Sequence, residues 1–143
     1  HNFGMIFSPD GTTRTRLSAY YMHIEPGNHA LSCGVYMPDP QALKAVRTAI
    51  DEEWETFSAI IGDPVFRKEI GDLSREEKVL KRVPTGFRKE SPAADYLRLC
   101  HFYVWVPLSD RLVCSERFVP DAARLFSRMK PLNDFLNRAI KNG

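Results

Sequence analysis

The sequence has few cysteines and no long apolar run. Its three cysteines, Cys33, Cys100 and Cys114, share no CxxC spacing, so we expect reduced thiols and no disulfide framework. The apolar stretch FYVWVPL, residues 102–108, is among the longest in the chain, yet it is far shorter than the ~20 residues that a membrane-spanning helix needs. These absences predict a cytoplasmic protein without a membrane partner.

Sequence patterns of common catalytic sites are also absent. The eight glycines form neither a GxGxxG nor a GxxxxGK pattern, which excludes the usual dinucleotide and phosphate-loop fingerprints. The chain contains no GxSxG elbow and no HxH or HExxH pair, so no serine nucleophile and no cofactor is indicated. Whether the protein is an enzyme, and with which cofactor, is therefore unknown from these patterns.

No repeat, low-complexity run or Gly/Ser linker divides the chain. Its 143 residues suit one domain with a single core, so we expect residues 1–143 to form a single domain. The first residue is His1, and strand-like sequence begins at Asn2 without a lead-in. This start predicts a fragment of a longer protein.

The net charge of +2 is unevenly divided. Up to Gly62 four basic residues stand against seven acidic ones, and from Asp63 onward sixteen stand against eleven. The basic second half permits an anionic partner, but general nucleic-acid binders are usually more basic. Nucleic-acid binding would require the arginines of this half to form one continuous stripe. Those arginines include Arg98, Arg111, Arg117, Arg124 and Arg128.

Residues 19–35 predict a β-hairpin. A four-residue loop, Pro26–His29, places His23 opposite Ser32 and is favoured, because a two-residue Pro-Gly loop needs a type II turn that splays the strands. Both loops give the same two faces, one apolar and turned to the core. The other face carries Tyr21, His23, Glu25, Ser32 and Tyr36.

Capping residues and periodicity predict two more strands and five helices. Asn2–Ser8 and His101–Leu108 are expected to be strands, the second in the sheet of the hairpin. The helices are expected at residues 40–61, after Asp63, from the capping box Ser74/Glu77, from Ser91 to Leu99, and from Phe118 to Ala139 with a kink before Pro131. The prediction is an α+β fold: a small antiparallel or mixed sheet of three to four strands with helices packed on it.

The hairpin offers one candidate site. His23 and Glu25 lie two residues apart on a strand, so their side chains point the same way at a separation of about 7 Å. If His101 projects to the same side from a neighbouring strand, the three form the ligand set of non-haem iron sites. His23 and Glu25 are also candidate acid–base residues. The alternative is an ordinary polar face of an antiparallel sheet.

The stretch KVLKRVPTGFRK, residues 78–89, offers a second candidate site and contains no acidic residue. Its proline and glycine force a loop in which backbone N–H groups can approach a ligand while arginine supplies a fork of donors. A phosphate or carboxylate would bind to Lys81, Arg82, Gly86, Arg88 and Lys89. The alternative is a solvated basic loop that Val83 and Phe87 anchor to the core.

Four stretches together resemble one known family. The stretches AYYMHIEPGN, GVYMPDPQALKAVR, LKRVPTGF and MKPLNDFLNRAI are similar to the bacterial conserved hypothetical proteins grouped as domain of unknown function 2461. The resemblance spans nearly the whole chain and implies an α+β fold, but no activity and no catalytic residues. It implies that His23, Glu25, Arg82 and Gly86 belong to a shared pattern, and that a further N-terminal part precedes this chain.

The sequence leaves the function unknown and favours a binder of a small anionic ligand at the basic loop. One alternative is a protein-interaction module that exposes Tyr103 and Trp105 on an apolar patch. The other is a metal-dependent enzyme that uses His23 and Glu25. The sequence does not predict an oligomeric state.

Overall fold

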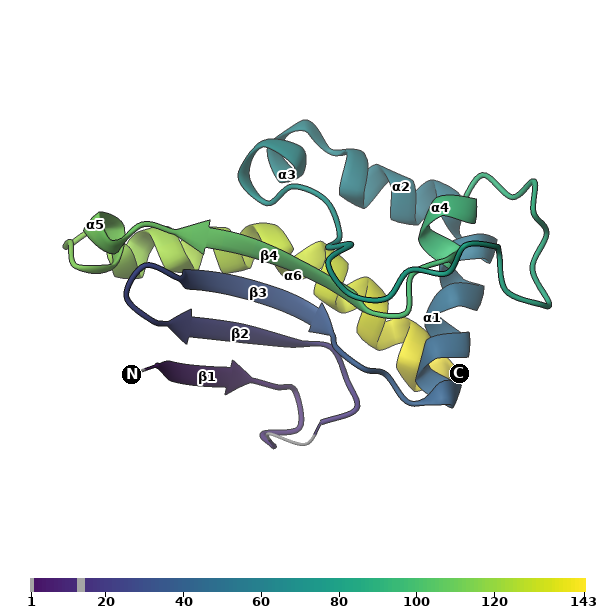
Figure 1. The fold of residues 1–143 in the computed structure, drawn as a ribbon, viewed down its shortest axis with the longest axis horizontal. Helices are drawn as coiled ribbons and strands as arrows, with labels where there is room; N and C mark the ends of the chain where they lie inside the picture. The colour runs from purple at the N-terminus through teal and green to yellow at the C-terminus, as the bar shows by residue number, and fades with distance from the viewer. Residues whose placement is uncertain (1, 13–14) are drawn as a thin grey trace.

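The computed structural model describes residues 2–12 and 15–143. Four strands form one antiparallel sheet in the order β1-β2-β3-β4 (Figure 1). The strands are β1 (Phe3–Phe7), β2 (Ala19–Ile24), β3 (His29–Val35) and β4 (Phe102–Leu108). The predicted α+β class, the hairpin and both further strands are therefore confirmed.

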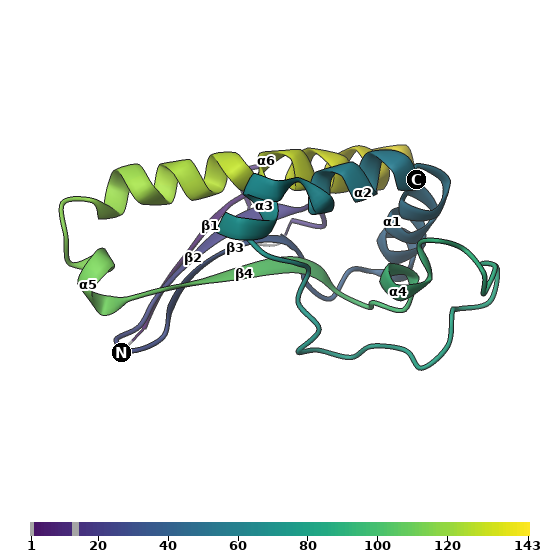
Figure 2. The same cartoon turned by 90° about the horizontal axis from the view of Figure 1, so that it is seen from above.

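Helices cover one face of this sheet. The long helix α6 (Phe118–Asn142) packs along it, and α2 (Trp54–Gly62) and α3 (Pro64–Glu69) lie on the same side (Figure 2). In the part of the chain that the structure describes, no helix lies over the middle of the opposite face. We call the covered side the core face and the other side the open face. None of the described helices is long and apolar enough to cross a membrane.

The helix predicted over residues 40–61 is two helices. α1 (Pro40–Glu52) ends at Glu53, whose φ of −110° and ψ of 38° are not helical, and α2 follows at once. The interruption lets the rings of Trp54 and Phe57 pack on Tyr96, with centroids 5.8 and 5.4 Å away. The prediction of one unbroken helix is wrong because periodicity does not reveal a packing partner some forty residues downstream.

The helix predicted from Ser74 does not form. The Ser74 backbone N–H donates to the Tyr103 carbonyl at 2.8 Å, and the Leu80 N–H donates to the Arg98 carbonyl at the same distance. These bonds hold the segment extended beside the start of β4. The Ser74 hydroxyl still accepts from the Glu76 N–H at 3.3 Å, so the capping residue closes a turn and not a helix.

Two of the remaining helices begin near predicted capping residues, α6 follows the predicted apolar periodicity, and one helix is an addition. α3 follows Asp63, whose carboxylate accepts from two backbone N–H groups, and α4 (Ala94–Leu97) is a short form of the helix predicted from Ser91. α6 continues through Pro131 as one helix. The sequence did not predict α5 (Asp110–Val113), a single turn after β4.

A buried amide ties α6 to the sheet. Asn137 Oδ1 accepts from the Ser18 backbone N–H at 2.7 Å, and Asn137 Nδ2 donates to the Ser18 carbonyl at 3.0 Å. Both residues are buried. The side chain of Asn137 therefore satisfies both backbone polar groups at the entry to β2, where neither faces water.

Candidate functional site

The hairpin has the two-residue Pro-Gly turn and not the predicted four-residue loop. Its closing bond runs from the Asn28 N–H to the Glu25 carbonyl at 2.7 Å. His23 pairs with Ala30 and not with Ser32 as predicted. The strand register therefore differs from the predicted one by two residues. Because side chains alternate with a period of two, every side chain stays on its predicted face.

Asp110 of α5 braces this turn. Asp110 Oδ1 accepts from the Gly27 N–H at 2.9 Å and lies 2.7 Å from His29 Nε2. His29 Nδ1 accepts from the Glu25 N–H at 3.0 Å, so the ring proton on Nε2 faces the carboxylate. These tertiary bonds offset the unfavourable twist of the turn. The preference for the longer loop was wrong because α5 was not predicted.

Asp110 is expected to stabilise the fold in a pH-dependent way. The hydrogen bond from the Gly27 N–H, and then that from His29, hold the pKa of the Asp110 carboxyl below its ordinary 3.8. A carboxyl with a lowered folded-state pKa contributes stability above its unfolded pKa and loses it as the pH falls through the folded pKa. Asp110→Asn should therefore lower the urea midpoint at neutral pH, and the difference should shrink below about pH 4.

Urea unfolding of both proteins across the acid range checks this expectation. The charge-matched control is Glu55→Gln, at an exposed position on α2. A difference between Asp110→Asn and wild type that stays constant down to about pH 2 would mean that the carboxylate charge plays no part.

The open face is hollowed along the central strand β3. Its outward positions hold the small residues Ala30, Ser32 and Gly34, while Ser32 lies between Tyr21 of β2 and Trp105 of β4. Ser32 of β3, larger side chains of β2 and β4, and the β1 residues Gly4, Met5 and Ile6 line a trough of about 570 Å³. We call it the open-face hollow. Its polar and aromatic lining comprises Thr15, Tyr21, His23, Ser32, Tyr36, Glu77, Tyr103 and Trp105.

Glycine is required at position 34, where β3 pairs with Tyr103 of β4. Its φ is +143°, and a Cβ at this position would lie 2.1 Å from the Phe102 carbonyl oxygen and 2.4 Å from Tyr103 Cα. A side chain does not fit there. The pairing of β3 with β4 at this position therefore depends on glycine.

Aromatic rings stand at both ends of the hollow. His23 and Trp105 lie at the hairpin end, with ring centroids 6.1 Å apart. At the other end Tyr36 contacts Tyr103 and His101, at 5.8 and 4.8 Å between centroids. The His101 Nδ1 atom accepts a hydrogen bond from the Met37 N–H at 2.9 Å, which holds the ring that supports Tyr36.

Negative charge lies at both ends as well. The carboxylate of Glu77 is the main cause of a raised pKa at the Tyr36 phenol. At the hairpin end, hydrogen bonds from His23, at 3.0 Å, and from Asn28 hold the pKa of the Glu25 carboxyl below its ordinary value. Burial raises the pKa of Tyr21. The face therefore combines two carboxylates with neutral phenols.

The structure does not bring the three predicted metal ligands together. His23 and Glu25 are in contact, but Ala30, the partner of His23, pairs with Pro107, six residues along β4 from His101. That separation is about 20 Å at ~3.3 Å per residue. Among the described residues no group of three His, Cys, Asp or Glu could hold a metal ion.

The basic loop lies against α1 and not beside the hairpin. Lys81, Arg82, Arg88 and Lys89 are exposed, and their side chains form no ion pair with any described residue. Val83 and Phe87 pack against the core as the alternative reading expected. A depression beside the loop is lined by the segment from Pro84 to Phe87 and by residues of α1, but by none of the four cations.

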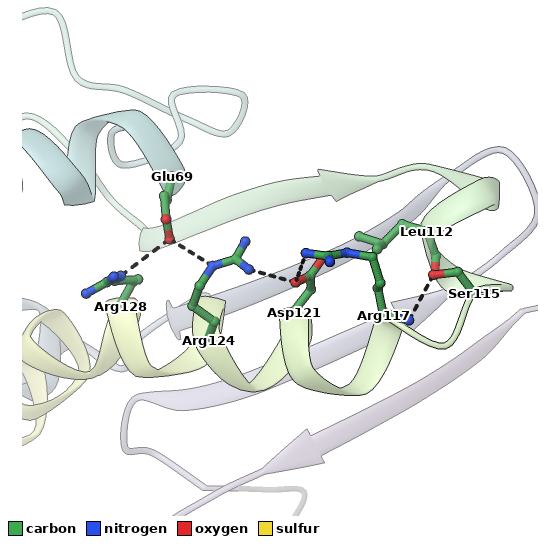
Figure 3. A network of polar contacts seen from close by, with 7 residues as sticks. All are labelled: Glu69, Leu112, Ser115, Arg117, Asp121, Arg124 and Arg128. Atoms are coloured by element: carbon green, nitrogen blue, oxygen red, sulfur yellow. Dashed lines mark hydrogen bonds and ion pairs between the residues drawn. The ribbon is translucent and has the colours of Figure 1, made fainter.

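Acidic residues neutralise most of the arginines that would have formed a nucleic-acid stripe. Figure 3 shows Glu69 Oε2 between Arg124 and Arg128, at 3.4 Å from each Nε atom. Asp121 binds Arg124 at 2.7 Å and Arg117 at 3.4 Å. Arg98, a further arginine of this set, pairs with Asp95 at 2.8 Å. This geometry gives no support to a continuous free stripe.

A family model described as "Conserved hypothetical protein (DUF2461)" matches residues 1–135. The chain belongs to this family. The match includes the hairpin, the basic loop and every lining residue of the open-face hollow. Comparison with curated proteins and with solved structures gives no match. Because the DUF2461 description states no activity, the function has to be argued from the geometry of the site.

Proposed function

We propose that this DUF2461 protein binds a small organic ligand in the open-face hollow. The observation that carries the proposal is the trough itself, with Ser32 of β3 between aromatic side chains of β2 and β4. Its volume of about 570 Å³ lies within the range of small-molecule sites, and aromatic walls with a few polar groups are typical of such sites.

The pairing of the polar groups favours binding over catalysis. The Ser32 hydroxyl donates to the Val104 carbonyl at 2.6 Å, and His23 is engaged with Glu25. A serine nucleophile would instead be hydrogen-bonded to its general base. Ser32 and His23 therefore lack the mutual pairing that nucleophilic catalysis needs, and in this proposal they contact the ligand without reacting with it.

Backbone strain at the rim supports the same proposal. Met37 has a φ of 53°, the left-handed region that residues other than glycine rarely adopt. Strain of this kind collects at ligand sites, where the surroundings maintain it. Here the hydrogen bond to His101 maintains it, and the preceding residue, Tyr36, lines the hollow.

A second candidate is the anionic ligand that the sequence favours. The supporting observation is that the four exposed cations of the basic loop are unpaired among the described residues, beside Gly86 with its φ of +98°. A phosphate or carboxylate could bind there without entering the open-face hollow. The two candidates therefore differ in where a ligand would be detected.

The position of the two tryptophans separates these candidates. Trp105 lines the hollow, whereas Trp54 packs on Phe57 and Tyr96 in the core, so Trp54→Phe leaves Trp105 as the reporter. A thermal-shift panel of nucleotides, phosphate, carboxylates, neutral aromatics and amines comes first. A ligand at about 100 times its Kd adds about 2.7 kcal/mol to stability.

We expect a compound that raises Tm and also changes Trp105 emission, and the Kd from the emission titration should account for the size of the Tm shift. The control is Trp105→Phe, in which the remaining Trp54 should stay silent at those concentrations. A compound that raises Tm, leaves Trp105 unchanged and loses its effect in Arg82→Ala/Arg88→Ala would place binding at the basic loop and contradict the proposal.

A further inference from the structure

The charge of the open-face hollow is one-sided. Glu77 lines it, and none of its described lining residues is Lys or Arg. A second depression of about 410 Å³ shares Glu77, Tyr103 and Trp105 with the hollow and adds Asp72, Ser74, Arg75 and Glu76. The two hollows therefore adjoin one another, and the carboxylate of Glu77 lies at their shared edge.

Two arginines lie at the second depression, and both are engaged away from Glu77. Arg67 pairs with Asp72 at 3.5 Å, and Arg75 lines the depression. Arg75 places its guanidinium carbon 5.3 Å from the centroid of the Tyr96 ring and donates to the Asp95 carbonyl at 3.3 Å. Both partners belong to α4. Arg75 therefore leaves Glu77 without a paired cation among the described residues.

Aromatic rings add to the attraction for positive charge. The face of a Tyr or Trp ring carries the negative end of its quadrupole, and ammonium groups bind over such faces, most tightly where several rings meet. Tyr21, Tyr36, Tyr103 and Trp105 all line the hollow. An anion placed there would be repelled by the Glu77 carboxylate and by any ring that presents its face to it.

We infer that the ligand of the open-face hollow is a small organic cation that carries a trimethylammonium or protonated amine group. The ammonium group lies among Tyr36, Tyr103 and Trp105 with Glu77 as its counter-charge. This inference rests on the proposed function. It adds the sign of the ligand charge, which the proposed function leaves open.

The experiment compares three probes of one shape. Choline carries a positive charge, its tert-butyl analogue has carbon in place of nitrogen and is neutral, and the matching tert-butyl carboxylate is negative. Each is titrated over the millimolar range against the full-length Trp54→Phe protein with Trp105 emission as the readout, and sodium chloride at equal ionic strength is the blank. We expect choline to bind about tenfold more tightly than the neutral analogue.

Glu77→Gln tests the counter-charge directly. It should weaken choline binding about threefold, as expected for an exposed charge pair, and leave the neutral analogue unchanged. Glu55→Gln on α2 removes the same charge outside the hollow and should change neither.

The outcomes separate this inference from the proposed function. Equal binding of choline and its neutral analogue, or tighter binding of the carboxylate, would overturn the cation inference and leave a ligand site in the hollow. Silence of choline and of the amines of the panel, while a neutral or anionic compound changes Trp105 emission, would overturn it as well. Silence of every compound, whatever its charge, would overturn both.

Discussion

Gly34→Ala is expected to lower the free energy of unfolding by about 4 kcal/mol. Two costs add at this position. The backbone φ of +143° is one that residues with a side chain rarely adopt, at about 1–3 kcal/mol. The new Cβ would also meet the backbone of Phe102 and Tyr103 at 2.1 and 2.4 Å, and such overpacking costs about 1–3 kcal/mol more.

Gly4→Ala is the matched control for that prediction. Gly4 also lies in a strand and lines the open-face hollow, but a Cβ built there has no neighbour within 4 Å. Its replacement should change stability by no more than about 0.5 kcal/mol. Urea unfolding of both variants measures the difference. Similar midpoints for the two would show that β3 and β4 can separate at Gly34 without cost.

Asn137→Ala is expected to cost about 3 kcal/mol. The substitution removes the amide that accepts from the Ser18 N–H and donates to the Ser18 carbonyl. Both buried backbone groups are then left without this partner. Each buried polar group left without a partner costs about 1–3 kcal/mol. Because the bond joins α6 to the entry of β2, the loss should appear in the cooperative unfolding of the whole fold.

Two further variants sharpen the Asn137 prediction. Asn142→Ala, at the exposed end of the same helix, is the control and should be nearly neutral. Asn137→Asp keeps the shape and one acceptor but cannot donate to the Ser18 carbonyl when ionised, and it buries a charge. It should therefore be at least as destabilising as Asn137→Ala at neutral pH. A neutral effect of both would mean that water replaces the amide.

The sequence predicted the two faces of the sheet because they depend on local chemistry. Strand side chains alternate, so the apolar residues Met22 and Leu31 already indicate which side is the core. Capping residues likewise predicted where α1 and α3 begin. These features depend on neighbours within a few residues, and one sequence contains that information.

The rest of the fold depended on contacts between distant residues. The two-residue turn is stabilised by Asp110, over eighty residues from Gly27. The segment from Ser74 is held extended by Tyr103, and α1 stops where Trp54 meets Tyr96. Local propensity favoured a different structure in each case, and tertiary bonds decided the outcome.

The candidate site was predicted in part. Tyr21, His23, Ser32 and Tyr36 were placed on one face from the alternation of β2 and β3, but Glu77 was assigned to a helix that does not form. One further signal was present in the sequence: Ala30, Ser32 and Gly34 are all small and alternate with buried apolar residues. Three small outward residues on a central strand indicate a trough once the strand order is known.

The separation of the two sheet faces has a consequence for how this family can diversify. The walls of the trough stand on β2 and β4, while the side chains that hold the fold together point to α6 on the other side. An exposed outward residue such as Trp105 can therefore be replaced without opening the core. Under the proposed function, ligand preference can then change by substitutions that leave the same core in place.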